Sequence, residues 1–277
     1  MTDPVVISGA MWVILSFFIA HWMLSVLFQS FFQHRYAAHR MFTMGPKTER
    51  FFHALTFLIQ GSSYLSPRAY AWLHREHHAF SDTERDPHSP HTFKDVFRMM
   101  WQTKIRYAGF VNRTLLPEER FQAGYPEWKL IDETLANSKL VTLGFIAAYT
   151  AVYAAFATTW WLWLLLPIHF MMGPVHGAIV NWCGHKYGYR NFNTSDKSRN
   201  TLPMDVLCMG ELFQNNHHTW GMSPNFAARK FEVDPTWQFI KVLSWARVIE
   251  IATPQRAVWP APHLRQSVVD QGTAPAS

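Results

Sequence analysis

VVISGAMWVILSFFIAHWMLSVLFQSFFQHRYAAHR occupies residues 5–40 and decides the fold, because it joins an uncharged apolar run directly to a pair of histidines. Val5 to Phe32 contains 28 residues without a lysine, arginine, aspartate or glutamate. About 20 helical residues cross a bilayer, so this run can span one with a turn to spare. It is too long for a signal peptide and lacks a basic start and a small-residue cleavage site. We therefore expect a transmembrane helix at about residues 8–32, with His34 and His39 just beyond its end.

A second apolar region runs from Leu140 to Cys183 and is long enough for two crossings. Thr158 and Thr159 lie near its middle, and the tryptophan-rich stretch that follows is typical of the aromatic belt at a membrane surface. The pattern predicts a hairpin of two spans at about residues 140–157 and 160–182.

The stretch from Phe51 to Ser66 is apolar but short, and polar residues and a glycine interrupt it. If it crossed the bilayer, the histidines before it and those after it would emerge on opposite faces and could not share a metal site. We therefore interpret residues 51–66 as an interfacial or re-entrant helix. The expected architecture is an all-α integral membrane protein, formed by a single domain over residues 1–277. About three to four transmembrane helices carry a cytoplasmic helical cap with a histidine-rich site for two metal ions.

The distribution of basic residues indicates the orientation in the membrane. Of the 25 lysines and arginines, fifteen lie between Arg35 and Lys139 and ten between Lys186 and Arg265. Positive charge marks the cytoplasmic side of a membrane protein. We therefore expect every histidine-rich segment on the cytoplasmic face, in a bacterial inner membrane. The small and polar residues at about 266–277 are expected to form a disordered tail.

The composition excludes several other classes. Only 16% of the residues are charged, against about 25% in a typical soluble domain. Two cysteines are too few for a thiolate-bound iron–sulfur cluster. The net charge of +6 fits an anionic membrane surface, and the sequence has no motif of a nucleic-acid-binding domain.

The histidines cluster in four boxes, HRYAAHR (34–40), HREHH (74–78), NWCGH (181–185) and QNNHH (214–218). The three imidazoles of HREHH share one face of a helix, whereas His34 and His39 are about 140° apart on an ideal α-helix. Imidazole is the commonest protein ligand of transition metals, and one site needs about four such groups. The boxes therefore predict a centre for two metal ions. The candidate ligands are His34, His39, His74, His77, His78, Asn181, His185, Gln214, His217 and His218.

Together with SDTERDPHSP (81–90), NWCGHKYGYR (181–190) and GELFQNNHHTW (210–220), these boxes resemble those of the integral-membrane fatty acid desaturases. Their order resembles the stearoyl-CoA (delta-9) branch, in a bacterial-type form, over about residues 20–240. The resemblance implies two iron ions, dioxygen, and a separate electron donor such as a ferredoxin, a rubredoxin or a cytochrome b5-like protein. It also implies a cis double bond, at delta-9, in a fatty acyl chain carried by CoA, a lipid or a carrier protein. No side-chain base can deprotonate an alkane, so this reaction needs an oxidant made from dioxygen at the metal.

Two positions depart from the pattern of that family. The third box of the family opens with histidine, where this chain has Gln214, whose carbonyl is a weaker donor than imidazole. The acyl-CoA branch carries a charged pair before its HxxHH box, where this chain has Trp72 and Leu73. The carrier of the acyl chain therefore stays open between CoA, lipid and carrier protein.

Other residues are candidates for supporting roles. Spare imidazoles that could compensate for Gln214 are His88, His91 and His176. Carboxylates that would orient the ligand imidazoles are Glu76, Asp82, Asp86, Asp205 and Glu211. Candidates for contact with the substrate or a partner are Arg68, Trp72 and Arg75.

Other functions fit parts of the pattern. A hydroxylase or another diiron oxygenase could use the same scaffold, although the Asn181–His185 pair and the DPHSP extension count against it. A non-enzymatic metal-binding or metal-transport protein would need polar residues inside the spans, where residues 140–167 offer only threonines and tyrosines. A zinc hydrolase is disfavoured because the chain has no HExxH motif. The expected function is oxygen-dependent desaturation of a fatty acyl chain.

Overall fold

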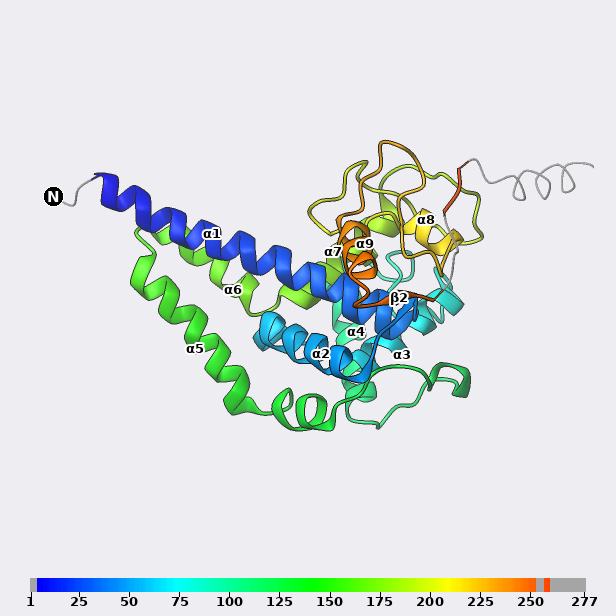
Figure 1. The fold of residues 1–277 in the computed structure, drawn as a ribbon, viewed down its shortest axis with the longest axis horizontal. Coiled ribbons are helices and arrows are strands. Elements are labelled where there is room, and N and C mark those ends of the chain that lie inside the picture. The colour runs from blue at the N-terminus through cyan, green and yellow to red at the C-terminus, as the bar shows by residue number, and fades with distance from the viewer. Residues whose placement is uncertain (1–3, 253–256, 260–277) are drawn as a thin grey trace, which may run out of the picture.

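Two long apolar helices project from a head of shorter helices and loops in the structure, a computed structural model that describes residues 4–252 and 257–259. Helices α1 (Pro4–Phe28) and α5 (Lys139–Phe156) leave the head separately and converge at their far ends (Figure 1). The tail expected at residues 266–277 lies outside the described residues. The remaining elements are η1 (Gln29–Ala38), β1 (Phe42–Thr43), α2 (Pro46–Gln60), η2 (Gly61–Ser63), α3 (Pro67–Phe80), α4 (Val96–Val111), η3 (Glu119–Phe121), η4 (Leu130–Leu135), η5 (Trp160–Leu165), α6 (Leu166–His169), α7 (Met172–Lys186), α8 (Gln214–Thr219), α9 (Pro235–Trp245) and β2 (Glu250–Ile251).

Within the described residues, two helices are long and apolar enough to cross a membrane, namely Gly9–Ala38, which joins α1 to η1, and α5. The segments η5–α6 and α7 pass the same test together but are bent by 81°, and they would form a third span if counted as one. The sequence led us to expect an unbroken span at residues 160–182. Pro174 explains the bend, because proline lacks a backbone N–H and its ring clashes with the carbonyl four residues earlier in a continuous helix. The prediction of an all-α membrane protein is confirmed.

Polar side chains hold the apolar helices together. His21 Nδ1 on α1 lies 2.6 Å from His169 Nδ1 on α6, and the Tyr153 hydroxyl on α5 lies 3.0 Å from His169 Nε2. His21 Nε2 lies 2.9 Å from the carbonyl oxygen of Ile59, near the end of α2. Apolar side chains alone give little direction to helix packing within lipid, so these contacts fix how α1, α2, α5 and α6 meet. The segment expected at 51–66 thus lies beside α1, as the second half of α2 followed by η2.

The end of the first span is wound as a π-helix, which sets the positions of the first two histidines. In η1 the backbone N–H of His39 donates to the carbonyl of His34, five residues earlier, at 3.1 Å. The wider turn of a π-helix, which is frequent at functional sites, brings residues five apart to the same side. The two imidazole centroids lie 5.0 Å apart. The separation of about 140° expected for an ideal α-helix is therefore wrong here.

Aromatic side chains pack around η1 and anchor it in the head. Phe31 stacks on Phe42 of β1 with ring centroids 5.0 Å apart, and it meets Phe52 of α2 edge-on at 5.0 Å. Strand β1 pairs antiparallel with β2, which places Phe42 opposite Ile251. These contacts join the end of the first span to α2 and to the last part of the described chain.

Arg35 fastens η1 to the loop before α9. Its guanidinium is fully buried, and Nη2 lies 3.0 Å from Asp234 Oδ2. Nη1 donates to the Pro224 carbonyl at 3.1 Å, and the guanidinium lies 3.9 Å from the ring centroid of Phe226. Asp234 in turn caps α9 by accepting from the backbone N–H of Trp237.

We expect Arg35→Met to lower the free energy of unfolding by about 3–5 kcal/mol, because it leaves the buried Asp234 carboxylate without its partner. Arg98→Ala is the control: that side chain is 68% exposed and lies 3.6 Å from Asp95, so its loss should cost no more than about 1 kcal/mol. Unfolding titrations in mixed detergent micelles would measure both. Equal stability of the two variants would contradict this account of Arg35.

Candidate metal centre and substrate cavity

Five imidazoles from three separate segments converge in the head. One ligand nitrogen from each lies within 4.8 Å of the others, from η1 (His34, His39), α3 (His74, His78) and α8 (His217). His39 Nε2 lies 2.7 Å from His74 Nε2, and His34 Nε2 lies 3.0 Å from His217 Nε2. Nitrogens that face each other so closely repel unless a proton or a cation lies between them. This five-histidine cluster therefore fits a metal ion.

A second group of imidazoles lies beside the first. His77 of α3, His185 of α7 and His218 of α8 also offer ligand nitrogens within 4.8 Å of one another. The Nε2 atom of each is buried and has no hydrogen-bond partner within the described part of the chain. An orphaned buried nitrogen is costly, and three that converge are explained if they bind a metal ion. We call this group the three-histidine cluster.

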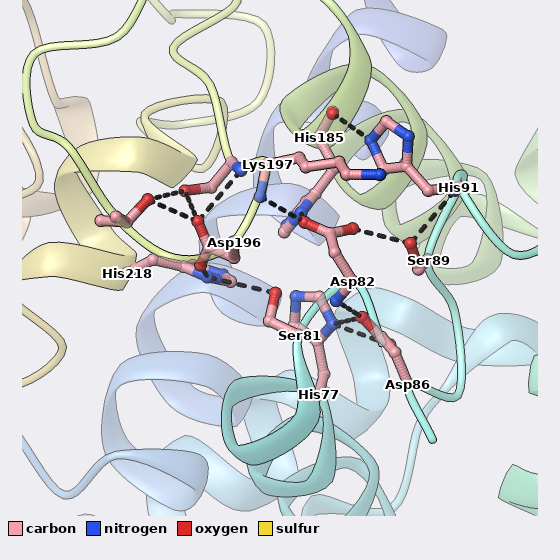
Figure 2. A network of polar contacts seen from close by, with 12 residues as sticks. His77, Ser81, Asp82, Asp86, Ser89, His91, His185, Asp196, Lys197 and His218 are labelled. Atoms are coloured by element: carbon pink, nitrogen blue, oxygen red, sulfur yellow. Dashed lines mark hydrogen bonds and ion pairs between the residues drawn. The ribbon is translucent and has the colours of Figure 1, made fainter. Parts of the chain in front are cut away.

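A carboxylate holds each imidazole of the three-histidine cluster from behind (Figure 2). The Nδ1 atoms of His77, His185 and His218 lie 2.9, 2.9 and 2.5 Å from carboxylate oxygens of Asp86, Asp82 and Asp196, respectively. Such a contact places the imidazole proton on Nδ1, leaves the Nε2 lone pair free and fixes the orientation of the ring. The three-histidine cluster is therefore arranged to ligate through Nε2.

Asp82 connects the end of α3 to two loops around this cluster. It follows the end of α3 and has a φ of +59°, in the left-handed region. Its carboxylate accepts from the Ser89 hydroxyl at 2.6 Å and from the backbone N–H of Lys197 at 2.7 Å, besides contacting His185 (Figure 2). These contacts fix the positions of the end of α3, the loop after it and the loop that carries Asp196 relative to one another.

Helix α8 has only six residues, so it depends on tertiary contacts. The Asn215 side-chain oxygen accepts from the backbone N–H groups of Asn191 and Phe192, both at 2.8 Å. The Asn216 amide donates to the Phe226 carbonyl at 2.8 Å. The two asparagines before the paired histidines therefore lock α8, with one histidine directed to each cluster.

The turn before α8 places Glu211 against the five-histidine cluster. Asp205 accepts two backbone N–H groups of this turn, and Gly210 has a φ of +91°. A Cβ atom on Gly210 would come within 2.4 Å of Asp234, so only glycine fits there. Glu211 then contacts Nδ1 of His34, in the way that the aspartates hold the other cluster.

Burial keeps most of these imidazoles neutral, which is the form that binds a metal. Burial, followed by the charges of neighbouring basic groups, holds the pKa of His39, His74, His78 and His217 well below 6.5. Burial also lowers the pKa of His218 to about 4, although Asp196 opposes the shift.

His77 behaves differently, because burial lowers its pKa but the carboxylates of Asp86, Asp82 and Asp196 together raise it by more. Its pKa therefore lies above the ordinary value of 6.5.

A cavity of about 740 Å³ leads to the metal centre, within the size range of small-molecule binding sites. His34 and His74 belong both to its wall and to the five-histidine cluster. Phe97 and Trp101 of α4, which are 83% and 58% exposed, line its outer part. Apolar side chains dominate the wall, among them Leu65, Leu73, Met100, Phe170 and Val180.

Residues 8–241 match the family model described as fatty acid desaturase. The chain belongs to the fatty acid desaturase family. As a member, it is a membrane-associated oxidoreductase that desaturates fatty acyl chains by iron-dependent chemistry. The predictions of the family and of the enzyme class are confirmed.

Several delta-9 desaturases and desaturase-like proteins are similar to this chain over most of their length. The chain is 30% identical to Delta-9 desaturase-like 5 protein of Arabidopsis thaliana, over 87% of this chain and 76% of that protein. It is 28% identical to Delta-9 acyl-lipid desaturase 1 of the same plant, over 79% and 68% of the two chains. It is also 28% identical to the sn-1 stearoyl-lipid 9-desaturase of Anabaena variabilis, over 79% and 77%.

The desaturase boxes are divided between the two clusters. HREHH gives His74 and His78 to the five-histidine cluster and His77 to the other, because residues four apart lie above one another on α3. QNNHH is divided in the same way, between His217 and His218. Every histidine expected as a ligand lies in one of the two clusters. This division is not readable from the sequence.

The two amides expected as ligands, Asn181 and Gln214, both line the cavity. Gln214 Nε2 donates to the Glu211 carbonyl at 2.7 Å. Its Cγ packs against α7, where a Cβ atom on Gly184 would come within 2.4 Å of it.

The carboxylates expected to orient the imidazoles lie in different places. Asp82, Asp86 and Glu211 each contact a histidine of a cluster. Glu76 instead accepts two hydrogen bonds from Arg106, at 2.6 and 2.7 Å.

Asp196, which contacts His218, was not among the carboxylates expected from the sequence. It lies in a loop between two boxes, and no spacing or motif marks it before the fold is known.

The three residues expected to contact the substrate or a partner are occupied within the head. Arg68 donates to the carbonyls of Phe110 and Val111, and Trp72 is buried. Arg75 donates to backbone carbonyls of η1 and of residues 121–124. These contacts hold α3, and with it the HREHH box, against its neighbours.

We expect Asp196→Asn to weaken metal binding at the three-histidine cluster by about 10–100-fold, because His218 loses the carboxylate that orients it. The five-histidine cluster should keep its affinity. Anaerobic titration with Co²⁺, followed by its visible absorption, would resolve the two sites. Glu118→Gln, which alters an exposed ion pair with Arg85, is the control, and an equal effect of both variants would argue against the orienting role.

The lowered histidine pKa values predict that the metal-free protein loses stability as the pH falls below about 6.5. The unfolded chain then binds more protons than the folded one. The free energy of unfolding should therefore fall by up to about 1.4 kcal/mol per histidine for each pH unit. His77, with its raised pKa, acts in the opposite direction. Thermal denaturation of chelator-treated protein between pH 7.5 and about 5 should show a falling midpoint, and a constant or rising midpoint would contradict the neutral state of the clusters.

Proposed function

We propose that this chain is a dioxygen-dependent delta-9 desaturase that holds two iron ions, one at each histidine cluster. The observation that carries the proposal is the shared position of His34 and His74, which belong to the five-histidine cluster and also line the apolar cavity. An acyl chain in that cavity would lie against the metal centre. The proposed ligands are the eight clustered histidines, and the amides of Asn181 and Gln214 line the cavity beside them.

Iron at these clusters would supply the reduction of dioxygen and the removal of two hydrogen atoms from neighbouring methylene groups. The chain itself has two tasks. Its carboxylates hold the imidazoles in one tautomer and orientation. Its apolar cavity orders a flexible acyl chain beside the metal centre, and water is kept from the reaction by the same apolar wall.

We propose a membrane lipid as the carrier of the acyl chain. Phe97, Trp101 and Ile105 recur every four residues along α4 and are all more than half exposed, so they form one apolar face. An apolar helix face of this kind fits the bilayer interface, and two of its residues line the cavity. Trp72 and Leu73, at the positions of the charged pair of the acyl-CoA branch, are buried. Names of relatives, which include acyl-lipid and stearoyl-lipid desaturases, agree with this choice.

We further propose that the protein spans a bacterial inner membrane several times with its metal centre on the cytoplasmic side. The absence of lysine and arginine before Arg35 supports this orientation. The electron donor would be a separate protein such as a ferredoxin, a rubredoxin or a cytochrome b5-like protein. Its encounter with the basic cytoplasmic surface would be favoured by negative charge on the donor.

Lipids of a desaturase-deficient host that expresses the chain test the proposal directly. Gas chromatography–mass spectrometry should detect a cis-9 monounsaturated acid that is absent when His77→Ala is expressed. In membranes supplied with labelled precursors and a reducing system, the label should appear in double bonds of lipid-bound chains and not of acyl-CoA. A hydroxylated acid would instead identify the oxygenase alternative, and a double bond elsewhere would contradict the delta-9 assignment.

A further inference from the structure

The two clusters differ in their number of imidazoles, five against three. Gln214 packs against Gly184, the residue before His185 of the smaller cluster, and its amide donates to the Glu211 carbonyl at 2.7 Å. A neutral amide oxygen is a weaker ligand of iron than imidazole. The three-histidine cluster therefore has room for one further nitrogen donor.

His88 has the features of such a donor. Its side chain is buried, with 3% exposure, and neither ring nitrogen has a hydrogen-bond partner within the described residues. Burying an imidazole without any hydrogen bond lowers the stability of the fold unless the ring binds a ligand. A metal ion is the ligand that its position suggests, because its ring centroid lies 4.5 Å from that of His77.

The backbone also directs His88 toward the cluster. Its N–H donates to Asp86 Oδ1 at 2.9 Å, and the same carboxylate holds His77 Nδ1. Ligand atoms of His77, Asp86 and His88 lie within 4.8 Å of one another. His88 lines the cavity together with Asn181 and Gln214, so it lies on the side where the cluster is short of a ligand.

The other spare imidazoles are less suited. His91 is engaged, since its Nε2 lies 2.9 Å from the His185 carbonyl. His176 is buried, but the charged groups around it are Glu211 and His34, which belong to the five-histidine side. Among the histidines that the structure describes, only His88 combines two unpartnered ring nitrogens with a position against the three-histidine cluster.

We propose that His88 is the fourth imidazole ligand of the three-histidine cluster and takes the place left by Gln214. This inference rests on the proposed diiron function. Its ring lies tilted against that of His77, with an angle of 32° between the ring planes, so ligation requires the side chain to turn toward the Nε2 atoms of His77, His185 and His218 when metal enters. The ligand set of each iron would then consist of imidazoles, with Gln214 left to shape the cavity wall.

Iron content and Mössbauer spectra of the purified, ⁵⁷Fe-loaded protein test the inference independently of turnover. His88→Ala and the milder His88→Gln should each lose about half of the bound iron, together with one of the two spectral components. His176→Ala, which removes the other buried cavity imidazole, should keep both components. In the background of His88→Ala, Gln214→His should restore the missing iron, because it supplies an imidazole from α8 at the first position of the QNNHH box.

Retention of both irons with unchanged spectra in the two His88 variants would overturn the inference and leave the diiron function intact. Loss of iron in His176→Ala but not in His88→Ala would overturn it as well. A wild-type protein that binds no iron would overturn the diiron function and the inference together. The iron kept at the five-histidine cluster reports that the variants are folded.

Discussion

The burial of eight imidazoles in one small volume is the constraint that shapes the head of this protein. Each ring must stay neutral or be paired with a carboxylate, and each must direct a nitrogen lone pair to the centre of its own cluster. The structure meets this requirement with a π-helix at His34 and His39, a left-handed residue at Asp82 and a glycine at position 210. All three are unusual conformations, and they occur where a ligand or its carboxylate has to be aimed. Strain of this kind persists only when the surroundings determine it, and it gathers at functional sites.

The surroundings here are polar and well connected. Arg35 joins the end of the first span to Asp234, and Asn215 and Asn216 hold α8 to loops on either side. The centre is therefore supported from behind by hydrogen bonds, while its open side is the apolar cavity. This division suits desaturation, because the metal ligands must be rigid and the acyl chain has to slide into place. It also fits the proposed lipid carrier, since an acyl chain of a membrane lipid would reach the cavity from the bilayer that the apolar helices enter.

Much of this arrangement could be predicted from the sequence, because the histidine boxes and the uncharged runs are local patterns. The eight clustered histidines, the family and the helical membrane fold follow from them. Their division between two clusters does not follow from the sequence. It depends on the π-helical winding of η1 and on the position of α8, and neither feature produces a repeating hydrophobic pattern in the sequence. Asp196 could not be found for the same reason, as only tertiary structure brings its loop to His218. The bend before α7 was in reach, because Pro174 was visible in the sequence.

Gln214 is a departure visible in the sequence whose surroundings only the structure reveals. The sequence marks it as a departure, and the structure shows what surrounds it, with an engaged amide on one side and the unpartnered ring of His88 near the same cluster. Gln214 is thus the position at which the third box of this chain departs from the pattern of its family.

The central claim is that the two clusters bind two iron ions. Anomalous scattering from crystals of the iron-loaded protein, measured on both sides of the iron absorption edge, tests it most directly. The account predicts two peaks, one among His34, His39, His74, His78 and His217 and the other among His77, His185 and His218. A single peak, or a peak outside both clusters, would contradict it.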